Sequence, residues 1–186
     1  MSAGEENRPF LKTKRFELWK PAAGDLDGLC RLIADEDMRR FLGPASPDPM
    51  EQFNRLGRNA GSWALYGYGS LYVRRPGEAD LLANCGVFHS WRGFGKGMDD
   101  TPEAGWIVRK DCWGEGLAQE VMHTVIAWFD KTHGPKRIAC MIEEGNIASE
   151  RVAARLGFMR YGRHEPEDER GAAVNLFERI SSNTTT

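Results

Sequence analysis

The chain has 186 residues, a hydrophobic fraction of 41%, a charged fraction of 28% and a formal net charge of −2. This length fits one domain with a sizeable core. The charge gives no electrostatic support for a nucleic-acid partner, and no apolar run is long enough to cross a membrane. Residues 1–6 are polar and acidic, unlike a secretory signal peptide, so we expect a cytoplasmic protein.

The cysteines are widely spread and form no C-x-x-C pair; they are Cys30, Cys85, Cys112 and Cys140. We therefore expect reduced, partly buried thiols. The four histidines form no ligand-spaced cluster with these cysteines, so the sequence predicts no metal site.

The first sixty residues predict one strand and then helices. The alternating run 15–19 predicts the strand, and Asp25 can cap a first helix whose apolar residues recur at helical spacing. A short helical turn is expected over residues 38–42. Pro49 then suits the first turn of a second long helix, which we expect to reach about Asn59.

The rest of the chain predicts a sheet interrupted by two helices. The expected strands are 69–75, 81–88, 103–108, 137–142, 158–163 and 173–180, and the expected helices are 117–131 and a short one that begins at Asn146 or Ser149 and closes at Gly157. Residues 103–142 should form a β-α-β unit. This order predicts an α/β fold of the mixed α+β kind: a single domain with a mixed, mostly antiparallel central sheet and helices on both faces.

The stretch Cys112–Glu120 reads C-W-G-E-G-L-A-Q-E and lies between a predicted strand and a predicted helix. Glycines let the backbone approach phosphate groups, and the first N–H groups of a helix are unpaired and attract anions. The stretch therefore predicts a site for a phosphate-bearing ligand. It fits neither the G-x-G-x-x-G dinucleotide pattern nor a P-loop, which needs Gly-Lys followed by Ser or Thr.

Two blocks of the sequence resemble the GNAT N-acetyltransferases. The glycine stretch is similar to their Q/R-x-x-G-x-G/A coenzyme A loop, although Asp111 departs from it at the first position, and to the W-G-x-G-x-A-x-E form of the RimJ/RimL-like branch. Residues Asn146–Phe158 resemble that branch's N-x-x-S-x-x-V-x-x-x-L-G-F signature. The resemblance covers about residues 13–180, and we expect flexible segments at 1–12 and 181–186.

The resemblance implies transfer of an acetyl group from acetyl-CoA, used as a co-substrate, to a primary amine by direct attack on the thioester. Backbone N–H groups of the loop would bind the pyrophosphate, with added charge from Arg109 and Lys110, and Asn146 would contact the pantetheine arm. The backbone of Ile107 or Val108 would stabilise the thioester oxygen. The expected coenzyme-binding residues are Ile107, Val108, Arg109, Trp113, Gly114, Glu115, Gly116, Leu117, Ala118 and Asn146.

Two residues are the candidates for the catalytic chemistry. Glu103, on the strand before the loop, is the candidate base for the amine, and its alternative role is that of a salt-bridge partner. Many GNAT enzymes supply a tyrosine acid at the position that corresponds here to Ala153. Ser149, one turn earlier, is therefore the candidate for thiol contact or proton donation, and its alternative role is to support the start of the helix.

The acceptor stays open at this stage. The resemblance favours a protein N-terminal α-amine, and small amines such as polyamines, amino acids or aminoglycosides are the alternatives. A module that binds acyl-CoA without catalysis is the alternative outside the enzymes, and Ala153 favours it. The polar, glycine-rich stretch from Trp91 to Asp100 is expected to border the acceptor cleft. Edge strands in such sheets often pair, so a homodimer is compatible with the predicted fold.

Overall fold

The computed structural model of the chain describes residues 8–43, 45–166 and 171–180. The strands are β1 (Leu11–Lys12), β2 (Glu17–Trp19), β3 (Ser70–Arg74), β4 (Ala83–Ser90), β5 (Thr101–Val108), β6 (Arg137–Glu143), β7 (Met159–His164) and β8 (Val174–Ile180). The helices are α1 (Leu26–Leu32), α2 (Glu36–Arg39), α3 (Pro49–Tyr66), α4 (Leu117–His133) and α5 (Ile147–Arg155), with short 3-10 turns η1 (Ala23–Asp25) and η2 (Lys110–Cys112). This is the predicted order with one strand added in front.

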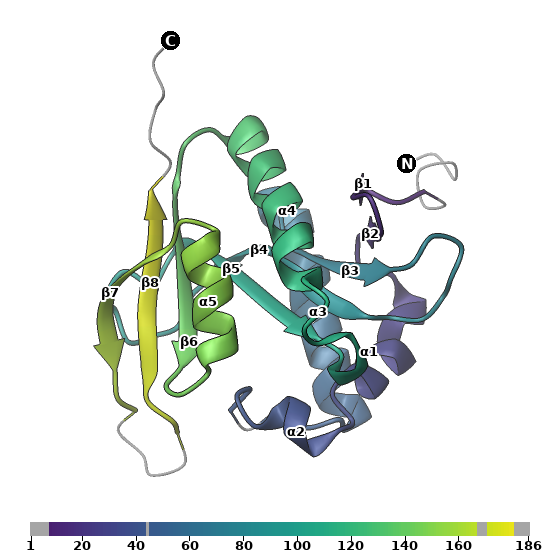
Figure 1. Ribbon diagram of the computed structural model, residues 1–186, viewed down its shortest axis with the longest axis horizontal. Coiled ribbons are helices and arrows are strands. Elements are labelled where there is room, and N and C mark those ends of the chain that lie inside the picture. Colours follow the sequence, from purple (N-terminus) through teal and green to yellow (C-terminus); the bar gives the residue numbers. More distant parts are fainter. Residues whose placement is uncertain (1–7, 44, 167–170, 181–186) are drawn as a thin grey trace.

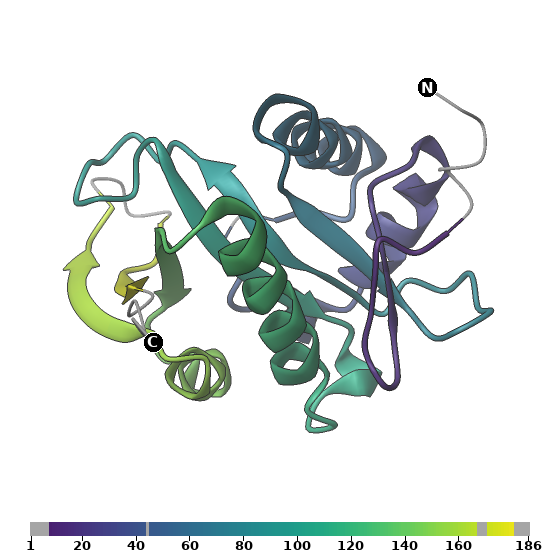
Figure 2. The same cartoon turned by 90° about the horizontal axis from the view of Figure 1, so that it is seen from above.

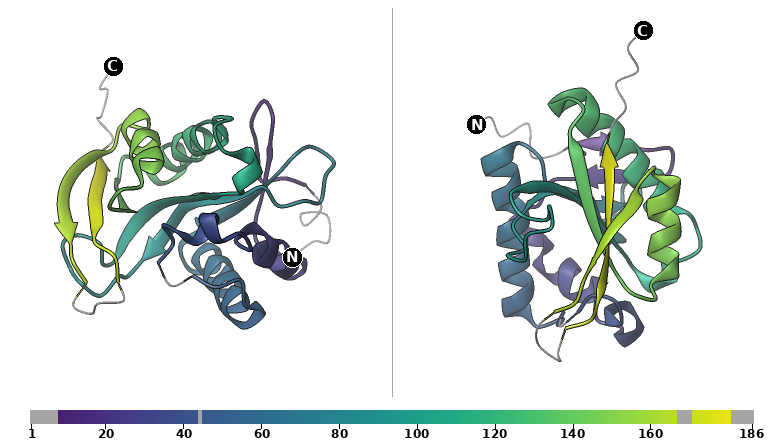
Figure 3. Two further views of the ribbon diagram at one scale, coloured as in Figure 1. Left: turned by 60° about the horizontal axis from the view of Figure 1, so that its bottom comes forward. Right: turned by 90° about the vertical axis from the view of Figure 1, so that its left-hand side faces the viewer.

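Within the described residues the strands form one sheet in the order β1-β2-β3-β4-β5-β6-β8-β7. Neighbouring strands are antiparallel except for β5 and β6, which are parallel and joined through α4. Helices α4 and α5 cover one face, and α1, α2 and α3 lie on the other (Figures 1, 2 and 3). The predicted fold class and the β-α-β unit are therefore confirmed.

Each face of the sheet has its own core. On one face α4 buries Val121, Val125 and Phe129, the stripe that its helical spacing predicts. On the other face a smaller core joins the apolar stripe of α1 to Tyr72 of β3. All four cysteines are free, and three of them are buried. No helix in the described ranges is both long and apolar enough to span a bilayer.

The N-terminal region corrects two predictions. Leu11 and Lys12 belong to β1, which pairs with Leu18 and Glu17 of β2, so these two residues are not a flexible segment. Residues 1–7 and 181–186 lie outside the described residues. Asp25 precedes α1, but its side chain does not cap the helix, because its carboxylate accepts hydrogen bonds from the Ala22 N–H and from Arg74 instead.

Helix α3 is longer than predicted. It begins at Pro49 with the Asp48 carboxylate capping its first turn, as the proline suggests, but it continues past Asn59 to Tyr66. Glycines within it cost helix propensity without breaking it, because packing outweighs propensity. The helix ends at Gly67, whose φ of 75° places it in the left-handed region that closes helices. Helix α2 likewise begins and ends earlier than the predicted turn over residues 38–42.

Candidate active site

A gap in the sheet defines the site. Strands β5 and β6 share a single paired position, Glu103 with Ala139, and then diverge, as Figure 1 shows. Strand β5 stays paired with β4 along its whole length. The backbone of β5 beyond Glu103 therefore faces open space on its β6 side. A cleft of about 680 Å³ lies here, with walls from α3, β4, β5, β6 and the start of α5.

The direction of the β5 backbone can be read from one hydrogen bond. The Arg109 N–H donates to the Leu82 carbonyl oxygen at 2.8 Å, so Arg109 and, two residues earlier, Ile107 face β4. Val108 faces the opposite way, toward the gap. Its carbonyl oxygen accepts from the Trp113 indole N–H at 2.7 Å. Of the two backbone donors expected for a thioester, the structure therefore directs Val108, and not Ile107, toward the gap.

The glycine loop forms the expected start of a helix. Gly114 and Gly116 have φ values of 78° and 74°, and a Cβ atom at either position would meet open space. Glycine is therefore required by the backbone conformation, not by crowding. Among the residues that the structure describes, no side chain caps the start of α4. Within the described residues, no acceptor takes the backbone N–H of Gly114, Glu115, Gly116, Leu117 or Ala118. These groups are free to bind an anion.

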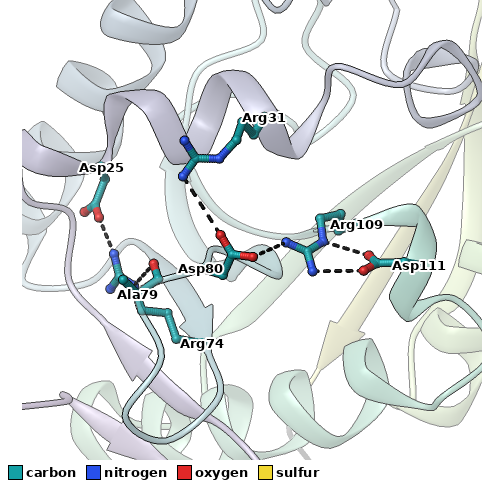
Figure 4. Close-up of polar contacts among 7 residues, drawn as sticks. All are labelled: Asp25, Arg31, Arg74, Ala79, Asp80, Arg109 and Asp111. Atoms are coloured by element: carbon teal, nitrogen blue, oxygen red, sulfur yellow. Dashed lines mark hydrogen bonds and ion pairs between the residues drawn. The ribbon is translucent and has the colours of Figure 1, made fainter.

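The cations beside the loop are already paired. Arg109 lies between Asp80 and Asp111, at 3.1 and 2.7 Å, and Asp80 also approaches Arg31 (Figure 4). The hydrogen bonds that Arg109 donates to Asp111 raise the pKa of Arg109 further. Asp111, the departure from the family pattern, thus holds the arginine that was expected to bind phosphate.

Lys110 is engaged in the same manner, with its Nζ 2.5 Å from Asp37 and 3.2 Å from Asp35 at the start of α2. The charge expected from Arg109 and Lys110 is therefore met by carboxylates of this chain. The loop offers an anion its backbone N–H groups.

Arg15 braces the loop from a distant part of the chain. Its Nη2 donates to the Glu115 carbonyl oxygen at 2.9 Å, and its Nε lies 2.7 Å from Glu120. Burial alone would raise the pKa of Glu120, but hydrogen bonds from Thr13 and Arg15 lower it overall. Sequence analysis missed this residue, because a single arginine in a turn carries no local signal for a contact with α4.

Glu103 is buried, with an exposed fraction of 2%. Both of its carboxylate oxygens accept hydrogen bonds from Arg92, at 2.8 and 2.5 Å. The alternative role as a salt-bridge partner is therefore present in the structure. Glu103 also lines the cleft, so its position remains compatible with proton transfer. Burial, reinforced by the Glu103 charge, raises the pKa of the neighbouring Cys140, which keeps that thiol protonated.

The start of α5 closes the other side of the cleft. The Asn146 side chain caps the helix by accepting the Ser149 N–H at 3.1 Å. The Ser149 hydroxyl oxygen accepts from the Trp106 indole at 3.3 Å, which leaves the hydroxyl proton free to donate. Asn146 and Ser149 both line the cleft.

Ala153 is fully buried. Its exposed fraction is 0%, it packs in the core under α4, and it is not among the described residues that line the cleft. Ser149, one turn earlier on α5, is the hydroxyl of this helix that lines the cleft.

The remaining side of the cleft comes from α3 and from the loop between β4 and β5, and we call it the acceptor side because this loop is expected to border the acceptor. The loop borders the cleft as predicted, through Trp91, Arg92 and Phe94. Asp99 shapes it by accepting the Gly93 and Gly95 N–H groups at 2.5 and 2.7 Å. Helix α3 contributes side chains that sequence analysis missed, namely Arg55, Arg58 and Asn59.

Known proteins support one family. The family model described as an acetyltransferase (GNAT) domain matches residues 15–159. The uncharacterized N-acetyltransferase YoaA of Bacillus subtilis is 22% identical over 163 residues, or 83% of this chain and 85% of that protein. A GnaT-family acetyltransferase from Bordetella pertussis is 32% identical, with a TM-score of 0.80 over 91% of this chain and 98% of that one.

A more distant solved structure has the same fold. It is RimL, a ribosomal L7/L12 α-N-protein acetyltransferase in complex with coenzyme A, which is 15% identical and superposes with a TM-score of 0.72 over 90% of this chain and 95% of that one. The family match spans most of the chain and includes the gap between β5 and β6 and the glycine loop. The chain therefore belongs to the GNAT acetyltransferase family and is an acetyltransferase.

Proposed function

We propose that the chain transfers an acetyl group from acetyl-CoA to a primary amine by direct attack. The observation that carries this proposal is the divergence of β5 from β6 beside the uncapped start of α4. The unpaired N–H groups from Gly114 to Ala118 suit the pyrophosphate, and the pantetheine arm can extend along the free edge of β5. RimL, a neighbour in fold, was solved with coenzyme A, which supports this choice of co-substrate.

The chemistry follows from what faces the gap. The amine nitrogen attacks the thioester carbonyl carbon, negative charge develops on its oxygen, and the Val108 N–H stabilises that charge. The carbon–sulfur bond then breaks, and the sulfur leaves as a thiolate. The Ser149 hydroxyl can donate a hydrogen bond to this thiolate, which then takes its proton from water, while Asn146 holds the first turn of α5 in place. The products are an acetylated amine and coenzyme A.

The amine must lose a proton, and Glu103 is the proposed acceptor, directly or through water. A lysine amine has a reference pKa of about 10.4, and an α-amine one of about 7.7–8.0, so the α-amine needs less help near neutral pH. The two hydrogen bonds from Arg92 fix the direction of the Glu103 carboxylate in the cleft. Proton transfer would then be brief and followed by release to water.

The RimJ/RimL-like branch, and with it a protein N-terminal α-amine, is the finer part of the proposal. Its supports are the W-G-x-G-x-A-x-E form of the loop, the Ser149 position, and the fold shared with a ribosomal α-N-protein acetyltransferase. A homodimer through β1 or β7, the two edges of the sheet, stays a prediction.

The test is a transfer assay read by mass spectrometry. Purified protein and acetyl-CoA are incubated with a pooled panel of free N-terminal peptides, internal-lysine peptides, amino acids, polyamines and aminoglycosides. A gain of one acetyl group on one class establishes transfer and names the acceptor type. Calorimetric binding of acetyl-CoA without any product would contradict transfer to these amines.

A further inference from the structure

Two arginines of α3 line the acceptor side of the cleft without a carboxylate partner. Within the described residues, neither Arg55 nor Arg58 takes part in an ion pair or a side-chain hydrogen bond, whereas Arg92 in the same cleft is held by Glu103. Arg55 is only partly exposed, whereas Arg58 is exposed, so the cost of lost hydration falls on Arg55. A guanidinium that loses water without gaining an acceptor is costly, which suggests that an acceptor comes from a ligand.

The charges around Arg55 also indicate that this arginine lacks an anionic partner. Burial, with repulsion from Arg58 and Arg92, lowers the pKa of Arg55, and the opposing charge of Glu51 on the preceding turn is too weak to prevent this. The acidic residues in the wall of this cleft, within the described residues, are Glu103, which Arg92 holds, and Glu143 at the far end of β6. An anion between Arg55 and Arg58 would relieve their repulsion and supply the missing hydrogen bonds.

A second, independent feature lies on the floor of the cleft. Asn84 of β4 has an exposed fraction of 7%, and its Oδ1 is buried with no hydrogen-bond partner within the described residues. It stands between Tyr72 and Ile107 in the sheet, on the α3 side. Buried amide oxygens are normally satisfied, so this one is free to accept a hydrogen bond from a ligand N–H.

The two features belong to one wall. Asn59 follows Arg58 in α3 and lies one turn after Arg55, and its Nδ2 donates to the Tyr72 hydroxyl at 3.1 Å. Tyr72 is the cross-strand neighbour of Asn84. This hydrogen bond therefore fixes the arginine pair over the part of the sheet that carries the free amide oxygen.

We propose that the acceptor is an amine that also carries a carboxylate, which Arg55 and Arg58 bind while the Asn84 amide oxygen accepts a hydrogen bond from the amine. This inference rests on the proposed acetyl transfer and narrows its acceptor. It disfavours polyamines and aminoglycosides, whose cationic groups the arginines would repel. The carboxylate can be that of a free amino acid or that of an acidic side chain near a peptide N-terminus.

The test compares matched acceptors with and without the charge. One pair is L-phenylalanine and L-phenylalaninamide, and the other is a peptide that begins Ser-Glu and its Ser-Gln counterpart. Each is measured with the wild type, with an Arg55→Gln/Arg58→Gln double variant, and with Arg160→Gln, which removes an exposed charge on β7 outside the cleft. Because the variant is compared with the wild type for each acceptor separately, differences in amine pKa cancel.

We expect the double variant to lose roughly 10- to 100-fold in kcat/KM, mainly through KM, for the carboxylate member of one pair, and little for its uncharged partner. The pair that responds identifies the source of the carboxylate. Arg160→Gln should change neither, and Arg55→Lys/Arg58→Lys should restore part of the loss. Asn84→Ala should lower kcat/KM roughly 2- to 10-fold for both members alike, because both carry the amine.

Failure of this inference can be distinguished from failure of the proposed acetyl transfer. Transfer only to uncharged or cationic amines, or an equal loss for both members of each pair in the double variant, overturns the inference and leaves acetyl transfer standing. If no amine is acetylated, acetyl transfer fails, and binding decides the inference. A carboxylate amine must then raise the melting temperature of the coenzyme A complex of the wild type and not of the double variant. If the carboxylate amine raises the melting temperature of both proteins equally, or of neither, the inference is overturned.

Discussion

The two sides of the cleft present different kinds of chemical group, backbone N–H groups on one side and side chains on the other. On the side that we propose binds coenzyme A, from Gly114 to the start of α5, most of the groups assigned to the ligand are backbone N–H groups, held by two left-handed glycines and one asparagine cap. On the acceptor side they are the side chains of α3 and of the loop after β4. The first side is encoded locally in the sequence. The second is assembled from segments far apart in the chain, so it can change between relatives without altering the fold.

The strongest test of the acceptor side is to remove the arginine that holds Glu103. Arg92→Met leaves a buried carboxylate without its partner, which should destabilise the protein by about 3–5 kcal/mol. Denaturant unfolding followed by circular dichroism measures this. The double variant Arg92→Met/Glu103→Gln should recover most of the loss, because no unpaired charge remains. Equal stabilities for the two variants would show that the pair contributes little.

The next test separates the two roles of Glu103. If it is the base, Glu103→Gln should lower kcat/KM roughly 100-fold near neutral pH, and the loss should shrink as rising pH deprotonates the amine in solution. Thiol release measured from pH 6.5 to 9.5 checks this. A loss that is the same at every pH would leave Glu103 with a structural role only. The unfolding free energy of the same variant serves as the control.

On the coenzyme side, a substitution at Gly116 should weaken acetyl-CoA binding only because it changes the backbone conformation of the loop. Gly116→Val forces a β-branched residue to a φ of 74°, which costs about 1–2 kcal/mol, so acetyl-CoA affinity should fall roughly 10-fold or the loop should change shape. Gly57→Ala is the matched control, because its Cβ also meets open space and its φ is not positive. Calorimetric affinities that do not differ between the two variants would contradict the assignment of the loop.

These differences explain what the sequence could predict. The glycine loop, the stripe on α4 and the start of α5 each depend on spacing within a few residues. The first two are present as predicted, and of the two predicted starts of α5 the structure has Asn146 as the cap. The predicted end of α3 was wrong because the helix continues through Gly61 to Tyr66, and packing outweighs the low helix propensity of that glycine. The contacts of Arg15, and the free state of Arg55, depend on which segments the fold brings together, which no local pattern records.

The smallest expected effect is on the pH dependence of protein stability, and it comes from His133, which lies away from both sides of the cleft. His133 packs among Tyr68, Trp128 and Phe129 at the end of α4, and its Nε2 is buried without a partner within the described residues.

Burial, assisted by the charge of Lys136, lowers the pKa of His133 below its model-compound value of 6.5. The folded state therefore resists protonation that the unfolded state accepts, so stability is complete above about pH 6.5 and declines as pH falls from there toward the lowered pKa. His133→Phe should flatten the unfolding free energy between pH 7.5 and 5.5. Glu120 and Asp111, whose pKa values are also lowered, act only at more acidic pH. If the unfolding free energy of His133→Phe falls with pH as steeply as that of the wild type, other groups cause the pH dependence of stability. The pH profile of Glu103→Gln would then have to be corrected for the contribution of those groups.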